Sequence, residues 1–202
     1  MVFWRKNEAW ACAVASCAIG RMSRKYKFHD QHKMYFISYA VVSWIDVFIR
    51  EDYRKVWIDS ARYCQDNKGL EIYAWCLMTS HAHMIIGTSG MPMENIVRDM
   101  KKHTSAQLKK AIADNMQESR REWMLEMMKQ VGKQNSNNTN FQFWQQHNQP
   151  LEIKNHSMFI KCLDYIHMNP VVAGFVNRAE DWIYSSADGY AKNKGLLKLH
   201  YP

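Results

Sequence analysis

Glycine and proline are scarce in this sequence, with 8 and 4 residues among 202. Collagen-like and low-complexity chains need far more of both, so neither class fits. Long apolar runs are also missing, because the small-residue stretch 11–19 is too short and too weakly apolar to cross a bilayer. With 47% hydrophobic and 23% charged residues, the composition is that of one globular domain of ordinary size.

Cysteines are few and poorly placed for cross-linking. The five cysteines are an odd number, and none forms a CxxC pair. Neither a disulfide framework nor a cysteine-rich zinc site is therefore expected. A signal peptide is a poor fit as well, since its apolar region would have to be a run of Ala, Cys and Ser. A reducing, cytoplasmic location fits best.

Acidic residues are outnumbered, which leaves a formal charge of +8. Lys and Arg release condensed counterions when they bind phosphate, so this charge favours a polyanionic partner such as nucleic acid. Residues 1–34 hold seven basic and two acidic residues, so +5 of the +8 lies there. The remainder is only mildly basic, and an ordinary solvated basic surface stays an alternative.

The chain divides into an extension and one domain. We expect residues 1–21 to be a poorly ordered N-terminal extension, with Met22 as an alternative start. Residues 22–202 then form a single domain that carries a helical, Asn-rich insertion around 113–140.

The first half predicts strand, helix, strand and strand. Residues 33–44 are rich in aromatic and β-branched residues without helical spacing, which indicates a buried strand. Apolar residues recur at helical intervals over 51–67, and Lys68-Gly69 follows as a stop signal. Residues 70–78 and 81–87 then predict a tight hairpin.

The second half predicts helices and one further strand. A long helix follows Pro92, with Lys101 and Lys102 on its wet face. A second helix covers about 118–131, and the polar stretch 132–140 ends it as a loop. Alternation over 141–146 favours a strand. The last clear helix runs from Ser157, a good N-cap, to Met168, where Asn169-Pro170 stops it.

The segment His81-Ala82-His83 is the first candidate for chemistry. Side chains two apart on a strand project from the same face, so both imidazoles can reach one metal ion. Ala82, Met84 and Ile86 then point to the opposite, apolar face. Two histidines alone leave a metal site incomplete, and a pair of solvent-facing histidines without a ligand is the alternative.

The last helix offers the second candidate. Tyr165 and Asn169 lie about 40° apart around its axis, and Tyr165 sits at the edge of the buried stripe. That position suits a phenol held by packing yet reachable by substrate, with a carboxamide oxygen one turn further on. Lys161, one turn before Tyr165, is placed for phosphate. An interfacial tyrosine whose hydroxyl bonds to solvent is the alternative.

Two blocks carry a family resemblance. The segments EIYAWCLMTSHAHMIIG (71–87) and YIHMNPVVAGFV (165–176), the latter followed by DW-x-YSSA, resemble the REP-associated tyrosine transposases. These form a group within the single-tyrosine HUH transposases of insertion-sequence type. The resemblance covers about residues 33–190. It implies an α+β fold, a ferredoxin-like antiparallel sheet with helices packed on one face.

The resemblance also implies the roles of the site residues. His81 and His83 would bind a divalent metal, Mg²⁺ or Mn²⁺, and Tyr165 would be the nucleophile. Asn169 would take the third metal-ligand position, where some relatives have Gln. The implied activity is that of a single-strand DNA endonuclease and ligase, which supports DNA transposition through a 5′-phosphotyrosine intermediate.

The implied partner is single-stranded DNA with hairpin structure, met in the cytoplasm at the nucleoid. Candidate DNA-binding residues are Lys161, Arg98, Lys101 and Lys102, although a solvated helix face explains each of them equally well. The resemblance leaves two arrangements open, a tyrosine that acts within one chain and a homodimer in which the tyrosine helix is swapped between subunits, as in some relatives.

Two other functions stay open at this point. A domesticated hairpin-binding protein would bind DNA specifically without transposition and with little or no covalent adduct. A metal-dependent phosphodiesterase would hydrolyse nucleic acid with the ion and water alone, so its activity would survive the change Tyr165→Phe.

Overall fold

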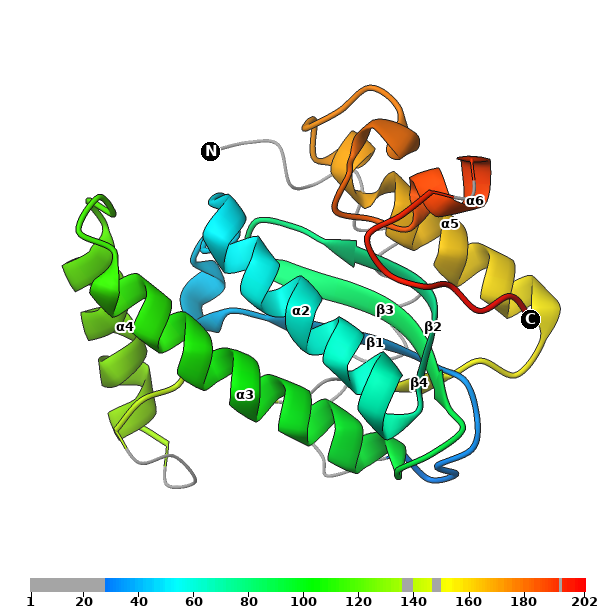
Figure 1. The fold of residues 1–202 in the computed structure, drawn as a ribbon, viewed down its shortest axis with the longest axis horizontal. Helices are drawn as coiled ribbons and strands as arrows, with labels where there is room; N and C mark the ends of the chain where they lie inside the picture. The colour runs from blue at the N-terminus through cyan, green and yellow to red at the C-terminus, as the bar shows by residue number, and fades with distance from the viewer. Residues whose placement is uncertain (1–27, 136–139, 147–149, 193) are drawn as a thin grey trace.

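The computed structural model describes residues 28–135, 140–146, 150–192 and 194–202, so the expected extension 1–21 lies outside the described residues. Within them, the strands form one four-stranded antiparallel sheet in the order β2-β3-β1-β4 (Figure 1). The strands are β1 (Tyr35–Ala40), β2 (Leu70–Leu77), β3 (His81–Thr88) and β4 (Leu151–Glu152).

Helices connect these strands in the order of a ferredoxin-like β-α-β-β-α-β chain, so the expected α+β class is confirmed. No helix among the described residues is both long enough and apolar enough to cross a membrane. The helices are η1 (Val42–Trp44), α2 (Glu51–Lys68), α3 (Met93–Asp114), α4 (Arg121–Lys133), α5 (His156–Val172), η2 (Ala179–Asp181) and α6 (Ala187–Lys192).

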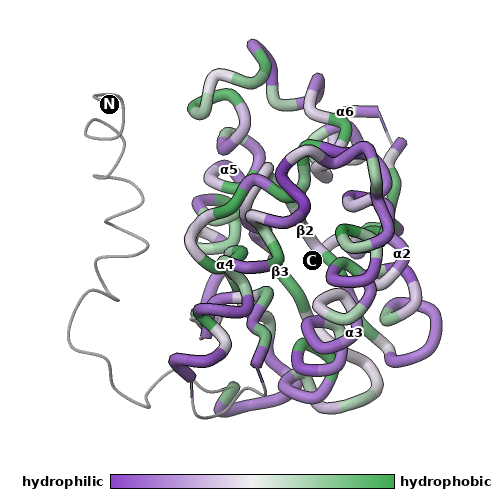
Figure 2. The backbone as a smooth tube through the Cα atoms, turned by 90° about the vertical axis from the view of Figure 1, so that its left-hand side faces the viewer, coloured by the Kyte–Doolittle hydropathy of each residue, from purple (hydrophilic) through white to green (hydrophobic). Residues whose placement is uncertain are grey.

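The sheet lies between two layers of helices (Figure 2). Helices α2 and α3 share one face, as expected, where Met84 and Ile86 of β3 pack with Trp57. Helix α5 covers the opposite face, where Phe36 and Ile85 pack against its apolar side chains. The structure therefore adds a helix on the second face of the sheet, and the histidines of β3 point toward that helix.

Local sequence signals explain the best-predicted elements. Helix α2 ends at Gly69, whose φ of 75° is the left-handed conformation that favours glycine. A Cβ at Gly69 would also lie only 2.6 Å from the backbone nitrogen of Gly90. In α3, the apolar residues that recur at helical intervals are buried: Ile96, Val97, Met100, Leu108 and Ile112.

The expected strand at 141–146 is wrong. Its described residues are irregular and make only an isolated bridge, between Trp144 and Val41. Gln142, Phe143 and Trp144 are all buried, so the alternation of apolar and polar residues does not mark two faces. The free edge of β1 is instead taken by the two-residue strand β4, which the sequence pattern did not reveal.

The boundaries of α4 also differ from those expected. Gly132 lies inside the helix rather than at the start of a loop. It is needed there because any Cβ would overlap the backbone of Phe141, which packs directly against it. Residues 136–139 of the Asn-rich stretch lie outside the described residues.

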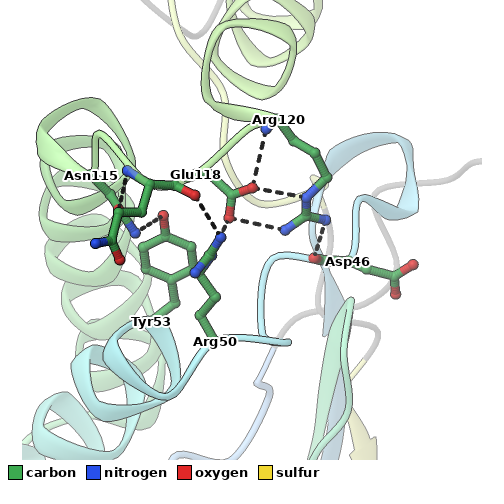
Figure 3. Close-up of polar contacts among 7 residues, drawn as sticks. Asp46, Arg50, Tyr53, Asn115, Glu118 and Arg120 are labelled. Carbon is green, nitrogen blue, oxygen red and sulfur yellow. Dashed lines mark hydrogen bonds and ion pairs between the residues drawn. The ribbon is translucent and has the colours of Figure 1, made fainter.

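Glu118, the expected start of α4, is instead a buried anchor in the turn before this helix (Figure 3). Its carboxylate accepts hydrogen bonds from Arg50 Nε at 2.6 Å and Arg120 Nε at 3.0 Å. Arg120 also donates to the carbonyl of Asp46, which ties the turn to the loop after β1. Burial alone would raise the pKa of Glu118, but the bonds from Arg120 and Arg50 lower it to about 2.

Replacing Glu118 by Gln is expected to destabilise the fold by about 2 kcal/mol at pH 7, because two half-buried guanidinium groups lose their counter-charge. A carboxylate with a lowered pKa stabilises the folded state above its unfolded pKa, and this contribution disappears as the pH falls toward 2. Urea denaturation measures the free energy of unfolding of Glu118→Gln and of the unmodified protein. We expect the difference between the two proteins to be smaller at pH 3 than at pH 7. The control is Glu122→Gln, whose side chain is 90% exposed. An equal difference at both pH values contradicts the assignment.

Candidate functional site

Strand β3 brings His81 and His83 together on the face that α5 covers. The alternation of side chains along a strand places both imidazoles on one side, and their ring centroids are 4.8 Å apart. Ala82, Met84 and Ile86 enter the core on the other side, as the sequence pattern predicts. Strands β1 and β2 flank β3, so the pair lies in the middle of the sheet.

His83 is a buried polar side chain without a partner. It is 5% exposed, and neither ring nitrogen has a hydrogen-bond partner. Burial, and secondarily the neighbouring His81, hold the pKa of His83 well below its usual range. Burial also lowers the pKa of His81 to about 4. Both rings are therefore neutral at pH 7, the form in which imidazole binds a metal.

Helix α5 begins earlier and ends later than its sequence suggests. Asn155 caps it, because its Oδ1 accepts a hydrogen bond from the backbone N–H of Met158 at 2.9 Å, so the expected cap at Ser157 is wrong. The helix also continues through Pro170 to Val172. Proline lacks the backbone N–H that a helix uses as a donor. Pro170 is buried, and the last turn of the helix closes with a hydrogen bond from the Ala173 N–H to the carbonyl of Asn169.

Tyr165 projects from α5 onto the two-histidine face. Its ring contacts the His83 ring edge-on, with centroids 5.1 Å apart, and the Phe36 ring at 5.9 Å. The side chain is half-buried and packs against the apolar cluster between α5 and the sheet. Tyr165 is thus held by packing beside His83.

Asn169 joins the two halves of the site, since its side chain hydrogen-bonds to both His81 and Tyr165. Burial lowers the pKa of His81, and the neighbouring Asn169 side chain raises it only in part. Burial raises the pKa of Tyr165, and the neighbouring Asn169 side chain lowers it in part.

The C-terminal signature holds α5 in register with the sheet. Ser186 Oγ bonds to His167 Nε2 at 2.8 Å and accepts from the backbone N–H of Trp75 at 3.0 Å. Trp182 Nε1 donates to the carbonyl of Leu77 at 3.1 Å. His167 is half-buried and lies two residues from Tyr165.

The basic residues expected to bind DNA divide between two regions. Lys161 is exposed on α5, one turn before Tyr165. Arg98, Lys101 and Lys102 lie on α3, in the layer on the other face of the sheet. Lys101, expected on the wet face, is instead half-buried: it donates to the carbonyl of Gln145 at 3.1 Å, and burial lowers its pKa to about 8. The structure therefore does not gather the α3 residues with Tyr165.

The donor atoms at the site suit a divalent metal ion. Over the described part of the chain, no three side chains drawn from His, Cys, Asp and Glu come together as a metal site. His81, His83 and Asn169 instead offer two neutral imidazoles and an amide oxygen, and the unpartnered nitrogens of His83 fit such a role. Three protein ligands leave further coordination positions for substrate and water.

Comparisons with known proteins give one family match and similar solved structures. Residues 41–139 match the family of IS200-like transposases, a range that includes both histidines and ends before Tyr165. No curated protein matches. The fold is similar to a REP-associated tyrosine transposase solved bound to a REP hairpin, with 17% identity, coverage of 89% of this chain and 92% of that chain, and a TM-score of 0.61.

A second solved structure, a transposase candidate from Deinococcus radiodurans R1, shares 19% identity over 47% of this chain and 73% of its own, with a TM-score of 0.33.

Proposed function

Because residues 41–139 match the family of IS200-like transposases, we propose that this chain nicks and rejoins single-stranded DNA near hairpins, with Tyr165 as the nucleophile. The observation that carries the proposal is the junction between α5 and β3. Tyr165 lies against His83, and Asn169 bonds to both Tyr165 and His81. One phosphodiester group placed there can contact the phenol and a metal ion held by the imidazoles.

In the proposed reaction, the Tyr165 oxygen attacks the scissile phosphorus and the bond from phosphorus to the 3′-oxygen breaks. The phenol loses its proton, and the departing 3′-oxygen gains one. The products are a 5′-phosphotyrosine and a free 3′-OH. Because one ester replaces another, the reverse attack by a 3′-OH rejoins strands without an external nucleotide.

We propose His81, His83 and Asn169 as the ligands of Mg²⁺ or Mn²⁺. Such an ion, when bound, polarises a non-bridging phosphate oxygen. The chain's own contribution is to present two imidazoles that need no deprotonation at pH 7. Packing of α5 on β3 then keeps Tyr165 beside them.

The proposed partner is a DNA hairpin with a single-stranded flank. The similar solved structure is bound to a REP hairpin, which supports this class of ligand. Exposed Lys161 on α5 is the basic residue best placed to contact the strand beside Tyr165. We also propose that the protein acts at the nucleoid in the cytoplasm. The pair formed by Tyr165 and His83 lies within one chain, so a monomer suffices for this chemistry.

Labelled single-stranded hairpins from the flanks of the gene, incubated with the protein and Mn²⁺, test the proposal. We expect a covalent protein–DNA band on a denaturing gel and no band when EDTA replaces Mn²⁺. Cleavage without a covalent band favours a metal-dependent phosphodiesterase. Specific binding without cleavage favours a domesticated hairpin-binding protein.

A further inference from the structure

An open hollow of about 600 Å³ lies between the end of α4 and the turn after β1. Its walls are rich in carboxamides. We call it the amide hollow, and its polar walls come from Ser43, Gln134, Asn135, Gln142, Gln145 and Gln146. None of the described residues that line it carries a charge.

The amide hollow adjoins a strained turn. Ser43, in its wall, and Trp44, the next residue, have φ values of 54° and 55°, which non-glycine residues rarely adopt. Two such residues in succession are costly, and this kind of strain clusters at ligand sites. Here the turn presents Trp44 to solvent with its side chain 53% exposed.

Trp44 connects the amide hollow with the candidate active site. Its ring contacts the His81 ring edge-on, with centroids 5.3 Å apart. Its chain neighbour Ser43 lies in the wall of the amide hollow, so Trp44 stands between His81 and the hollow along the chain. An exposed indole in this position is a suitable stacking surface, because every nucleobase has a π-face.

The chemistry of the hollow favours a nucleobase over a phosphate. A carboxamide both donates and accepts hydrogen bonds, as the edge of an unpaired base does, whereas a phosphate only accepts them and gains most from cations. The walls are also ordered in advance: Asn135 Nδ2 donates to Gln142 Oε1 at 2.8 Å, and Gln145 Nε2 donates to the Val41 carbonyl at 3.3 Å. Gln134 and Gln146 are exposed at the rim.

We propose that Trp44 and the amide hollow form a binding site for two successive unpaired DNA bases next to the scissile phosphate. Trp44 stacks on the first base, and the hollow receives the second, whose edge contacts Gln134 and Gln146. The position of this site relative to the scissile phosphate rests on the proposed function. Base binding itself does not require nicking.

Fluorescence anisotropy with labelled DNA hairpins in EDTA tests this site without any cleavage. The full chain is titrated with blunt hairpins and with hairpins that carry a short single-stranded extension on either side. Abasic sites then replace the bases of the extension one at a time. The variants are Trp44→Ala, Trp44→Phe and Gln146→Leu. Matched controls are Trp123→Ala, which is also 53% exposed, and Gln130→Leu, an exposed glutamine of α4 outside the hollow.

We expect Trp44→Ala to weaken binding of an extended hairpin about tenfold, with blunt hairpins unaffected and Trp44→Phe close to the unmodified protein. An abasic site at the base that stacks on Trp44 should cause no further loss of affinity in Trp44→Ala, because that contact is already absent. In Gln146→Leu, an abasic site at the second base, which the hollow receives, should likewise cause no further loss of affinity. Unchanged binding in Trp44→Ala and Gln146→Leu, or equal losses in the two controls, overturns the proposal.

The outcome separates this site from the proposed function. Base-dependent binding that requires Trp44, in a protein that never forms a covalent adduct, contradicts nicking and leaves the site intact. If the covalent adduct forms but neither Trp44→Ala nor Gln146→Leu changes the affinity for DNA, the proposed base-binding site is contradicted and nicking is not.

Discussion

Replacing Tyr165 by phenylalanine is expected to abolish the covalent protein–DNA adduct, a loss of at least about a thousandfold. Phenylalanine keeps the ring that packs against His83 and Phe36 but lacks the oxygen that would attack phosphorus. The measurement is the rate of adduct formation with a labelled hairpin and Mn²⁺ on a denaturing gel.

Two controls belong to this experiment. Hairpin binding in EDTA should be unchanged in Tyr165→Phe, because the packing of α5 on the sheet is kept. Tyr63→Phe, at a tyrosine of α2 that is 58% exposed, should form adduct at the normal rate. An adduct that persists in Tyr165→Phe assigns the nucleophile to another residue, and cleavage that persists without adduct assigns the reaction to metal-bound water.

Replacing His83 by leucine should have two opposite effects. Adduct formation with Mn²⁺ should fall by at least about a hundredfold, because the ion loses a ligand. The metal-free protein should become more stable by about 1 kcal/mol, because a buried imidazole with two unpartnered nitrogens costs free energy that an apolar side chain of similar size avoids. Urea denaturation in EDTA and in Mn²⁺ measures both states.

The effect of Mn²⁺ on the free energy of unfolding tests the role of His83 more directly. Mn²⁺ should stabilise the unmodified protein, since a ligand that binds only the folded state raises the free energy of unfolding. It should not stabilise His83→Leu, while His103→Leu, at an exposed histidine of α3, should respond normally. A stabilising effect of Mn²⁺ that survives in His83→Leu contradicts the assignment of His83 as a ligand.

Local periodicity explains why much of the fold could be predicted. Strand β3 alternates between two environments, with His83 and Ile85 toward α5 and Met84 toward α2 and α3. Helix α2 ends at Gly69 for a local conformational reason. These signals depend on neighbours within a few residues, so they are readable without the tertiary structure.

The sequence-based predictions were wrong where contacts between residues far apart in the chain decide the local structure. Residues 141–146 alternate like a strand, but Gln142 is buried and its Nε2 donates to the carbonyl of Trp144. Helix α5 continues past a proline because that proline is buried at its end. His167 has a partner, Ser186, 19 residues further along the chain. None of these contacts leaves a periodic pattern.

The sequence by itself determined which residue types are available and which face of each element they occupy: two imidazoles on one side of a strand, and a phenol one helical turn from a carboxamide. Only the tertiary structure decided that α5 crosses the face carrying the imidazoles, that Asn169 bonds to His81 as well as Tyr165, and that Trp44 stands beside His81. The physical reason is that side-chain direction follows from local backbone geometry, whereas the meeting of separate elements follows from the burial of apolar surface across the whole domain.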